Sequence, residues 1–224
     1  MITNYQDILS LLKEVETFAE SEMAAYIIGG GALMKHGIKS QTKDIDLVTR
    51  STEEFNMLTE VFYDLGFRSE MPEPSYSRLA LAHILTRDDY RIDLFDRVVC
   101  RKLYLSEGMM SRSVTEPSFK KLRLCVCAPE DILIFKAVTE RDGDRDDAED
   151  IIRKHDVGWD VVVSEIKHQV SVGEDVWITW IATFFDELAE RMIPIPAKYE
   201  MDRLSDEYFK RFERERPYCS KECR

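Results

Sequence analysis

The segment AAYIIGGGALMKHGIKSQTKDIDLVT, residues 24–49, carries the pattern that decides the fold. It opens with the short apolar run AAYII, which stops at three consecutive glycines and is typical of a buried strand. The next stretch, GALMKHG, favours a short helix over residues 31–37 that ends at Gly37. The alternating DIDLVT predicts another strand over residues 44–49. The segment therefore predicts a strand, a glycine turn, a short helix and a second strand.

The flanking sequence extends this pattern in both directions. Asn4 is a helix N-cap before an amphipathic stretch, and Ser51-x-x-Glu54 is a capping box that opens a helix running to about Gly66. RLALAHILT (78–86) and YRIDLF (90–95) predict a hairpin, and LRLCVC (122–127) predicts a further strand. From Pro129 onward the apolar residues recur at helical spacing, over residues 129–140, 144–155, 159–170, 174–191 and 199–216.

This order of elements predicts an α+β fold. Strands and helices mix up to about residue 128, and only helices follow. We therefore expect a small mixed β-sheet core with flanking helices in residues 1–128. A helical C-terminal region would occupy residues 129–224.

Length and charge exclude several classes of protein. The 224 residues carry 31 Lys and Arg against 43 Asp and Glu, a net charge of −12, and 44% are hydrophobic. A chain of this composition can bury a core, and its acidity argues against broad, non-specific binding to nucleic acid. No apolar run approaches the ~20 residues that span a bilayer. The N-terminus lacks a signal-peptide pattern and the number of cysteines is odd, so we expect a cytoplasmic protein with reduced thiols and no membrane partner.

The glycine cluster is the first candidate for a functional site. Gly29, Gly30 and Gly31 follow a strand and precede a helix, where a backbone without side chains can approach a ligand closely. The free N–H groups of the next helix would suit a triphosphate. Taken alone, such a cluster is usually an ordinary turn.

The second candidate is Thr42-x-Asp44-Ile45-Asp46. Residues two apart on a strand point to the same face, so Asp44 and Asp46 would place two carboxylates side by side. Their repulsion calls for a cation, and Mg²⁺ (or Mn²⁺) takes carboxylate and phosphate oxygens. The alternative is a pair of acids that simply face solvent.

The third candidate is Asp93, which lies inside the apolar strand RIDLF. On a neighbouring strand in matching register it would join the other two acids, and three carboxylates can hold two metal ions. The alternative is a strand-edge acid that pairs with Arg91 or Arg97.

The ordered combination of these motifs resembles a known family. A hydrophobic residue, Gly-Gly, 13 intervening residues, Asp-Ile-Asp and a later hydrophobic-Asp-hydrophobic strand look like the polymerase β nucleotidyltransferase superfamily. Within it, IIGGGALMKHGIKSQTKDIDLV is most similar to the branch of AbiEii-type toxins and related nucleotidyl transferases of bacteria and archaea. The sequence departs from that branch at Ser40 and Gln41, where an arginine is common. The resemblance covers residues 26–48 and 91–95, and weakly 128–151.

The resemblance implies roles for individual residues. Gly29 and Gly30 would contact phosphates, Asp44 and Asp46 would bind metal, and Asp93 would be the third carboxylate, binding metal and helping to deprotonate an acceptor hydroxyl. We add Gly31 and Thr42 to the nucleotide-binding residues because they belong to the same motifs.

A later segment, APEDILIFKAVTERDGDRDDAED, is similar to a downstream motif of the same branch. By that similarity Lys136 would contact nucleotide phosphates, and Arg145 and Asp147 would belong to the motif. Lys39, beside Ser40 and Gln41, is a further candidate for the site. The residues alone leave two alternatives open. Lys136 would extend its amine to the surface, as lysines in apolar helices do, and the acids of 142–150 would form a solvated helix face.

The sequence therefore predicts a Mg²⁺-dependent nucleotidyltransferase. It would move a nucleoside monophosphate from an NTP to an unidentified acceptor (RNA, protein or small molecule) and release pyrophosphate. Two alternatives are a toxin-type nucleotidyltransferase of a toxin–antitoxin pair that acts on tRNA or protein, and a catalytically weak binding or scaffold protein. An antitoxin or a second copy of the chain is a possible protein partner.

Overall fold

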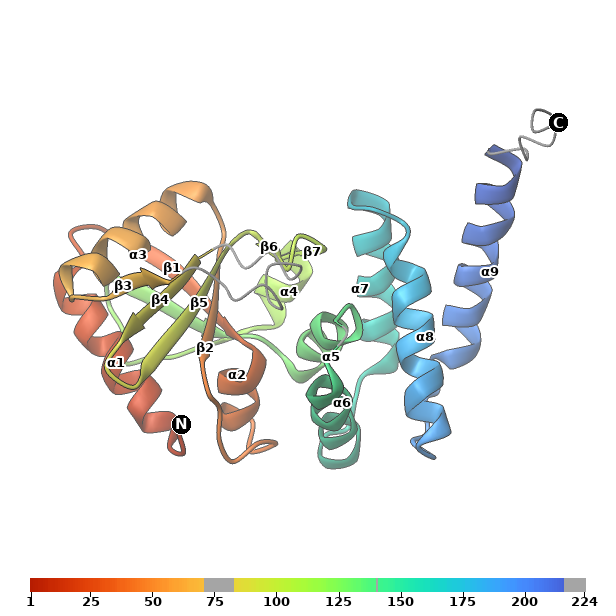
Figure 1. Cartoon of the computed structure of the whole chain (residues 1–224), viewed down its shortest axis with the longest axis horizontal. Coiled ribbons are helices and arrows are strands. Elements are labelled where there is room, and N and C mark those ends of the chain that lie inside the picture. The colour runs from red at the N-terminus through yellow and green to blue at the C-terminus, as the bar shows by residue number, and fades with distance from the viewer. Residues whose placement is uncertain (71–82, 140, 216–224) are drawn as a thin grey trace, which may run out of the picture.

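The computed structural model describes residues 1–70, 83–139 and 141–215. A seven-stranded sheet with its helices forms one half of the molecule, and helices α5 to α9 form the other (Figure 1). The α+β fold with a helical C-terminal region is thereby confirmed. Its division into domains at residue 128 stays a prediction.

The sheet is mixed, with the strand order β3-β4-β5-β2-β1-β9-β8. The central strand β2 pairs antiparallel with β1 and parallel with β5, while β1 pairs parallel with β9. β3, β4 and β5 form an antiparallel edge, and β6 and β7 make a separate two-stranded ribbon. The bounds are β1 Met23–Ile28, β2 Ile45–Thr49, β3 Arg68–Glu70, β4 His83–Arg87, β5 Tyr90–Asp96, β6 Val98–Val99, β7 Leu103–Tyr104, β8 Val114–Thr115 and β9 Leu122–Val126.

The segment 24–49 folds as its pattern predicts. All six residues of β1 are buried, as expected for a strand in the middle of a sheet. Helix α2 (Gly29–Lys35) begins directly after β1, two residues earlier than predicted, because Gly29 itself makes the turn with a φ of +59°. β2 then starts at Ile45, so Asp44 lies just before the strand rather than in it.

Helices α1 (Tyr5–Phe18) and α3 (Thr52–Asp64) support the sheet and begin at the predicted caps. The Asn4 side chain accepts a hydrogen bond from the backbone of Gln6, and that of Ser51 accepts one from Glu54. α3 packs against β1, β2 and β5, and α1 packs against α2 and α3. These helices hold the strands that carry the glycines and acids of the predicted site.

The predicted hairpin is present as β4 and β5 with its turn at Asp88, whose φ is +52°. The predicted residues 78–82 lie outside the described part of the chain. Short elements were missed, namely β3, β6, β7, β8 and helix α4 (Glu107–Arg112). Strands of two or three residues and a helix of six residues are too short to show a periodicity.

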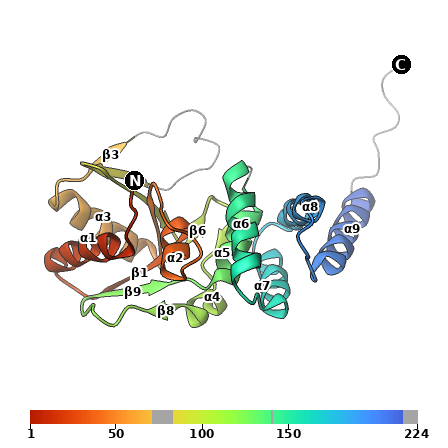
Figure 2. The same cartoon turned by 90° about the horizontal axis from the view of Figure 1, so that it is seen from below.

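After β9 the described elements are all helical, as predicted, with small shifts at their ends (Figure 2). In Figure 2, α5 and α6 lie next to the sheet half and α9 lies farthest from it. Their bounds are α5 Pro129–Ala137, α6 Asp142–Lys154, α7 Trp159–Val172, α8 Trp177–Glu190 and α9 Lys198–Glu215. None of the helices in the described part of the chain is both long and apolar enough to cross a membrane.

A buried ion-pair network anchors α5. Arg112 of α4 lies 2.6 Å from Asp131 of α5 and 2.6 Å from Glu165 of α7. Asp131 is completely buried, and burial raises its pKa to about 6, although the ion pair with Arg112 acts in the opposite direction. The network fixes α5 between α4 and α7, and α5 carries Lys136 toward the sheet.

Candidate active site

Two of the three predicted acids lie directly opposite each other. Asp46 on β2 and Asp93 on β5 are paired in register across parallel strands, whose spacing is about 4.8 Å. Side chains in register on neighbouring strands point to the same face of the sheet. Asp44 is two residues before Asp46 and directly precedes β2. The register predicted for Asp93 is therefore the one observed.

The glycines lie against these acids and leave no room for side chains. A Cβ built on Gly29 would lie 2.1 Å from Oδ2 of Asp46, and one on Gly30 would lie 2.3 Å from Oγ1 of Thr42. Thr42 in turn donates a hydrogen bond of 3.0 Å to the backbone carbonyl of Asp44. Only glycine permits this approach, so the glycine motif and the Asp-x-Asp motif form one unit. Gly31 faces α1 and β1 instead, where its Cβ would meet Ile8 and Ile27.

Asp93 is buried and paired. It is 1% exposed, and its two carboxylate oxygens accept hydrogen bonds of 2.7 and 3.1 Å from Arg91. The Arg91 pairing that we considered from the sequence is therefore present, although β5 is an internal strand of the sheet rather than an edge. Burial raises the pKa of Asp93, the hydrogen bond from Arg91 lowers it, and the charge of Asp44 raises it further.

Asp46 has an environment that favours a cation. Burial raises its pKa well above the usual range, and the charges of Asp44 and Asp93 raise it further. Lys136 and Arg141 act in the opposite direction without cancelling this effect.

Lys136 of α5 and Lys39 of the loop between α2 and β2 meet next to these acids. Lys136 of α5 lies 2.5 Å from Asp144 and 2.8 Å from Asp147 of α6, and Lys39 lies 2.5 Å from Asp147. Burial disfavours a charged Lys136, but Asp144 and Asp147 outweigh that effect and raise its pKa. The surface alternative for Lys136 is wrong, because its side chain is only 15% exposed. The solvated-face alternative is also wrong for Asp144 and Asp147, which are 4% and 7% exposed.

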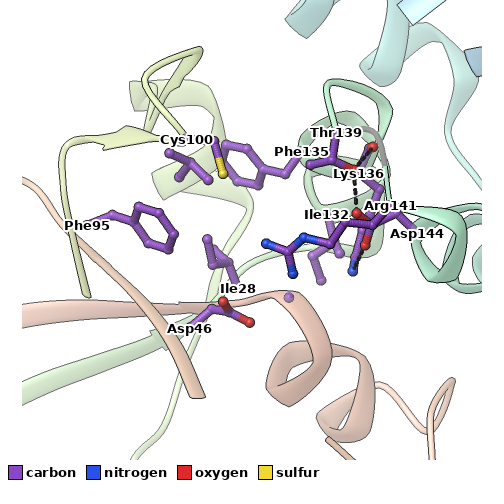
Figure 3. Close-up of a pocket in the computed structure, with 12 residues that line it drawn as sticks. Ile28, Asp46, Phe95, Cys100, Ile132, Phe135, Lys136, Thr139, Arg141 and Asp144 are labelled. Carbon is purple, nitrogen blue, oxygen red and sulfur yellow. Dashed lines mark hydrogen bonds and ion pairs between the residues drawn. The ribbon is translucent and has the colours of Figure 1, made fainter. Parts of the chain in front are cut away.

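Asp44, Asp46, Lys39 and Lys136 line one cleft between the sheet half and the helical half, and Asp93 is buried beside Asp46 without lining it. Gly30, Lys39, Thr42, Asp44 and Asp46 line its polar end, together with Lys136, Arg141 and Asp147. Figure 3 shows the other end, where apolar side chains surround the guanidinium of Arg141, which extends toward Asp46 and Ile28. The structure therefore brings together, of the residues predicted from the sequence, Gly29, Gly30, Thr42, Asp44, Asp46, Lys39, Lys136 and Asp147, but not Gly31.

Arg145 lies elsewhere. Its guanidinium is 2.7 Å from Glu187 and stacks on Phe184, both on α8, so it faces a different depression. Arg141, which we did not single out from the sequence, lines the cleft instead. Arg141 directly precedes the acidic run of residues 142–150 and Arg145 lies within it. The sequence offers no signal to choose between them, because the packing of α6 decides which guanidinium reaches the acids.

The donor set suits a hard divalent cation. Asp44, Asp46 and Asp93 supply only carboxylate oxygens, and the charge around Asp46 is relieved by a cation. Across residues 1–70, 83–139 and 141–215, however, no three His, Cys, Asp or Glu side chains are already arranged as a metal-binding group. One physical reason is that Arg91 occupies both oxygens of Asp93. The residues fit Mg²⁺ or Mn²⁺, with Asp44 and Asp46 as the accessible pair.

A family model matches residues 4–191, and its description is nucleotidyltransferase of unknown function (DUF6036). The chain belongs to this family. DUF6036 membership assigns the chain to the nucleotidyltransferases, as the motifs predict, and makes it a transferase. The narrower resemblance to the AbiEii-like branch stays a prediction. No curated protein matches the chain.

Two solved structures are similar to this DUF6036 chain. ANT(2″)-Ia in complex with adenylyl-2″-tobramycin has 14% identity and a TM-score of 0.47, with 81% of this chain and 98% of that chain covered. A candidate nucleotidyltransferase from H. pylori has 12% identity and a TM-score of 0.41, with 96% and 98% covered.

Proposed function

We propose that this protein transfers a nucleoside monophosphate from an NTP to an acceptor hydroxyl in a reaction that depends on Mg²⁺ or Mn²⁺. The observation that carries the proposal is the unit of Gly29, Asp46 and Asp93. Two carboxylates stand in register on neighbouring strands, and a backbone turn approaches one of them more closely than any side chain would allow. Membership of DUF6036 supports the same chemistry.

The reaction needs phosphates to be held and an oxygen to be activated. In the proposed reaction the acceptor oxygen forms a bond to the α-phosphorus, the bond to the β-phosphate breaks, and pyrophosphate leaves. The backbone of Gly29 and Gly30 leaves space for phosphate oxygens, and Lys39 and Lys136 supply positive charge at the polar end of the cleft. The proton of the acceptor hydroxyl would pass to Asp93, after Arg91 has released one of its oxygens.

The metal would be held by Asp44 and Asp46. When bound, such an ion neutralises developing charge on the phosphates and lowers the pKa of an attacking hydroxyl. Phosphoryl-transfer catalysis is mostly positioning and electrostatic stabilisation of this kind. The proposed acceptor is an RNA, a protein or a small molecule.

The test is transfer of label from each α-labelled NTP, with Mg²⁺, to separated RNA, protein and small-molecule fractions of an extract. We expect label in one fraction with the wild-type chain, and a loss of at least about 10²-fold for Asp46→Asn. Asp96→Asn is the matched control, because Asp96 lies on the same strand as Asp93 but pairs with Thr52 and Arg97 outside the cleft.

Binding of Mg²⁺–NTP, measured by calorimetry, is the second readout. Metal-dependent binding that Asp46→Asn removes and Asp96→Asn keeps would support the proposal even if the extract lacks the acceptor. Absence of both transfer and binding would overturn it and favour the scaffold alternative.

A further inference from the structure

The ribbon of β6 and β7 makes an unusual turn at one end of the cleft. The amide of Lys102 donates a hydrogen bond of 3.0 Å to the carbonyl of Val99, which closes a four-residue turn. Its central residues, Cys100 and Arg101, have φ values of +53° and +57°, a left-handed conformation that residues with side chains rarely adopt. Turns of this shape usually carry Asn and Gly at these positions. Contacts outside the turn must therefore hold it in place.

This ribbon forms part of the wall of the cleft. Val99 and Cys100 line the end of the cleft away from Lys39, together with Phe135 and Lys136 of α5. The ribbon follows β5 in the chain and lies on the side of the sheet half that faces the helices (Figures 1 and 2). The position of the ribbon relative to α5 therefore helps to shape the cleft at this end.

Lys102, the last residue of the turn, connects the ribbon to α5. Its side chain is half-buried, and its amine donates a hydrogen bond of 2.5 Å to the carbonyl of Val138, the C-terminal cap residue of α5. The last carbonyls of a helix have no partner within the helix and carry partial negative charge. An ammonium group at this place therefore stabilises the end of α5.

Two indole rings of α8 hold the same ammonium group. Nζ of Lys102 lies 3.8 Å from the ring centre of Trp180 and 5.0 Å from that of Trp177. A cation is attracted to the face of an aromatic ring, most strongly to that of tryptophan. Lys102 thus contacts α5 and α8 from the ribbon, but it lines neither end of the cleft. Any effect of Lys102 on the site would therefore pass through another residue.

The residue best placed to transmit this effect is Lys136. It lies two positions before Val138 on α5, and its amine pairs with two acids of α6 in the cleft. The carbonyl of Lys136 accepts a hydrogen bond of 2.9 Å from the hydroxyl of Thr139. The end of α5 and the start of the next turn therefore form one hydrogen-bonded unit, which Lys102 holds at Val138.

We propose that Lys102 is a positioning residue for the proposed reaction. By holding the end of α5 against the β6–β7 turn and α8, it keeps the amine of Lys136 where it meets the phosphates of the NTP. The inference rests on the proposed function and adds to it a residue that does not touch the substrate. Without this contact the end of α5 can shift, and a displacement of about 1 Å in a group that binds substrate costs up to about 10²-fold in rate.

The test is a double-mutant cycle with Lys102→Met and Lys136→Gln, read out as the dissociation constant of an Mg²⁺–NTP complex for the full chain. Lys102→Met removes the positive charge and the hydrogen-bond donor but keeps an unbranched side chain. The Mg²⁺ complexes of ATP, GTP, CTP and UTP are all tested with the wild-type chain, and the NTP that binds most tightly is used for the variants.

Lys13→Met is the matched control. Nζ of Lys13 lies 4.4 Å from the ring centre of Phe119 and donates a hydrogen bond to the carbonyl of Ser118. Lys13 therefore combines an aromatic ring and a backbone carbonyl as Lys102 does, but on α1, and it lines neither end of the cleft. Urea denaturation of each variant shows whether it is folded.

We expect Lys102→Met to weaken NTP binding by about fivefold or more, and Lys13→Met to leave it within about twofold of wild type. Because Lys102 acts through Lys136, the double variant should bind within about twofold of Lys136→Gln alone. If Lys102→Met does not fold, Lys102→Gln, which keeps a hydrogen-bond donor, takes its place in the cycle with the same expectations.

Three results would each overturn the inference. An unchanged NTP affinity of the folded Lys102 variant would leave this lysine a role in stability only. Equal weakening by Lys13→Met would point to a general effect of losing such a contact. Losses that multiply in the double variant would show that Lys102 acts independently of Lys136. If the wild-type chain binds none of the four Mg²⁺–NTP complexes, the proposed function itself fails.

Discussion

Replacement of Gly29 by alanine tests whether the glycine turn and Asp46 act as one unit. The new Cβ would lie 2.1 Å from Oδ2 of Asp46 and 2.9 Å from Cγ, so the carboxylate or the turn must move by about 1 Å. A displacement of that size in a catalytic group costs on the order of 10²-fold in rate. The φ of +59° adds about 1–2 kcal/mol of backbone strain for a residue with a side chain.

Gly37→Ala separates these two effects. Gly37 has a φ of +69°, but a Cβ there would meet nothing within 4 Å. We therefore expect both variants to lose about 1–2 kcal/mol of unfolding free energy in urea. Only Gly29→Ala should also lose label transfer, by about 10²-fold per folded molecule, together with Mg²⁺-dependent NTP binding.

The reasoning is refuted if folded Gly29→Ala retains transfer or NTP binding within about threefold of Gly37→Ala. That result would mean that Asp46 is not held where the turn places it, or that its position does not matter. A loss of activity in both variants would point to a general loss of the fold, which the urea transition of each variant reports directly.

Two further predictions concern the ion pairs around the site. Arg91→Gln leaves the buried carboxylate of Asp93 without its charged partner, so we expect the unfolding free energy in urea to fall by about 1–3 kcal/mol. Arg97→Gln is the control, and it should lose about 0.5 kcal/mol or less because the Arg97 side chain is 57% exposed. Equal losses in the two variants would contradict the importance of the Arg91–Asp93 pair. Asp131 has a folded-state pKa raised to about 6, so the folded protein binds its proton more tightly than the unfolded chain does, and this contribution to stability is lost as pH rises from about 4 to 6. Over that range the unfolding free energy of the wild-type chain should fall by up to about 3 kcal/mol relative to that of Asp131→Asn, as measured by denaturation at each pH. Parallel pH profiles of unfolding free energy for the two proteins would refute the raised pKa of Asp131.

Local pattern was sufficient for much of the fold. A buried strand of apolar residues, a run of glycines and a capping serine each act over a few residues, so β1, the glycine turn and α3 could be predicted without knowing their neighbours. Elements of two or three residues, such as β6 and β7, form only because other parts of the chain pair with them or cover them.

The sequence by itself determined which residues form the candidate site. Gly29, Asp44 and Asp46 belong to one strand–helix–strand unit. The short-range geometry of that unit brings these residues together without help from distant parts of the chain. The pairing of Asp93 with Asp46 needed a strand register between segments 47 residues apart, which the sequence suggested and the sheet provides.

Only the tertiary structure decided which charged side chains form ion pairs with one another and which of them line the cleft. It paired Asp93 with Arg91, buried Lys136 between Asp144 and Asp147, and brought Arg141 rather than Arg145 into the cleft. These outcomes depend on how α5 and α6 pack against the sheet and α8. The physical reason is that long charged side chains reach several partners from one backbone position, and the burial of each partner, which no local pattern records, determines which pair forms.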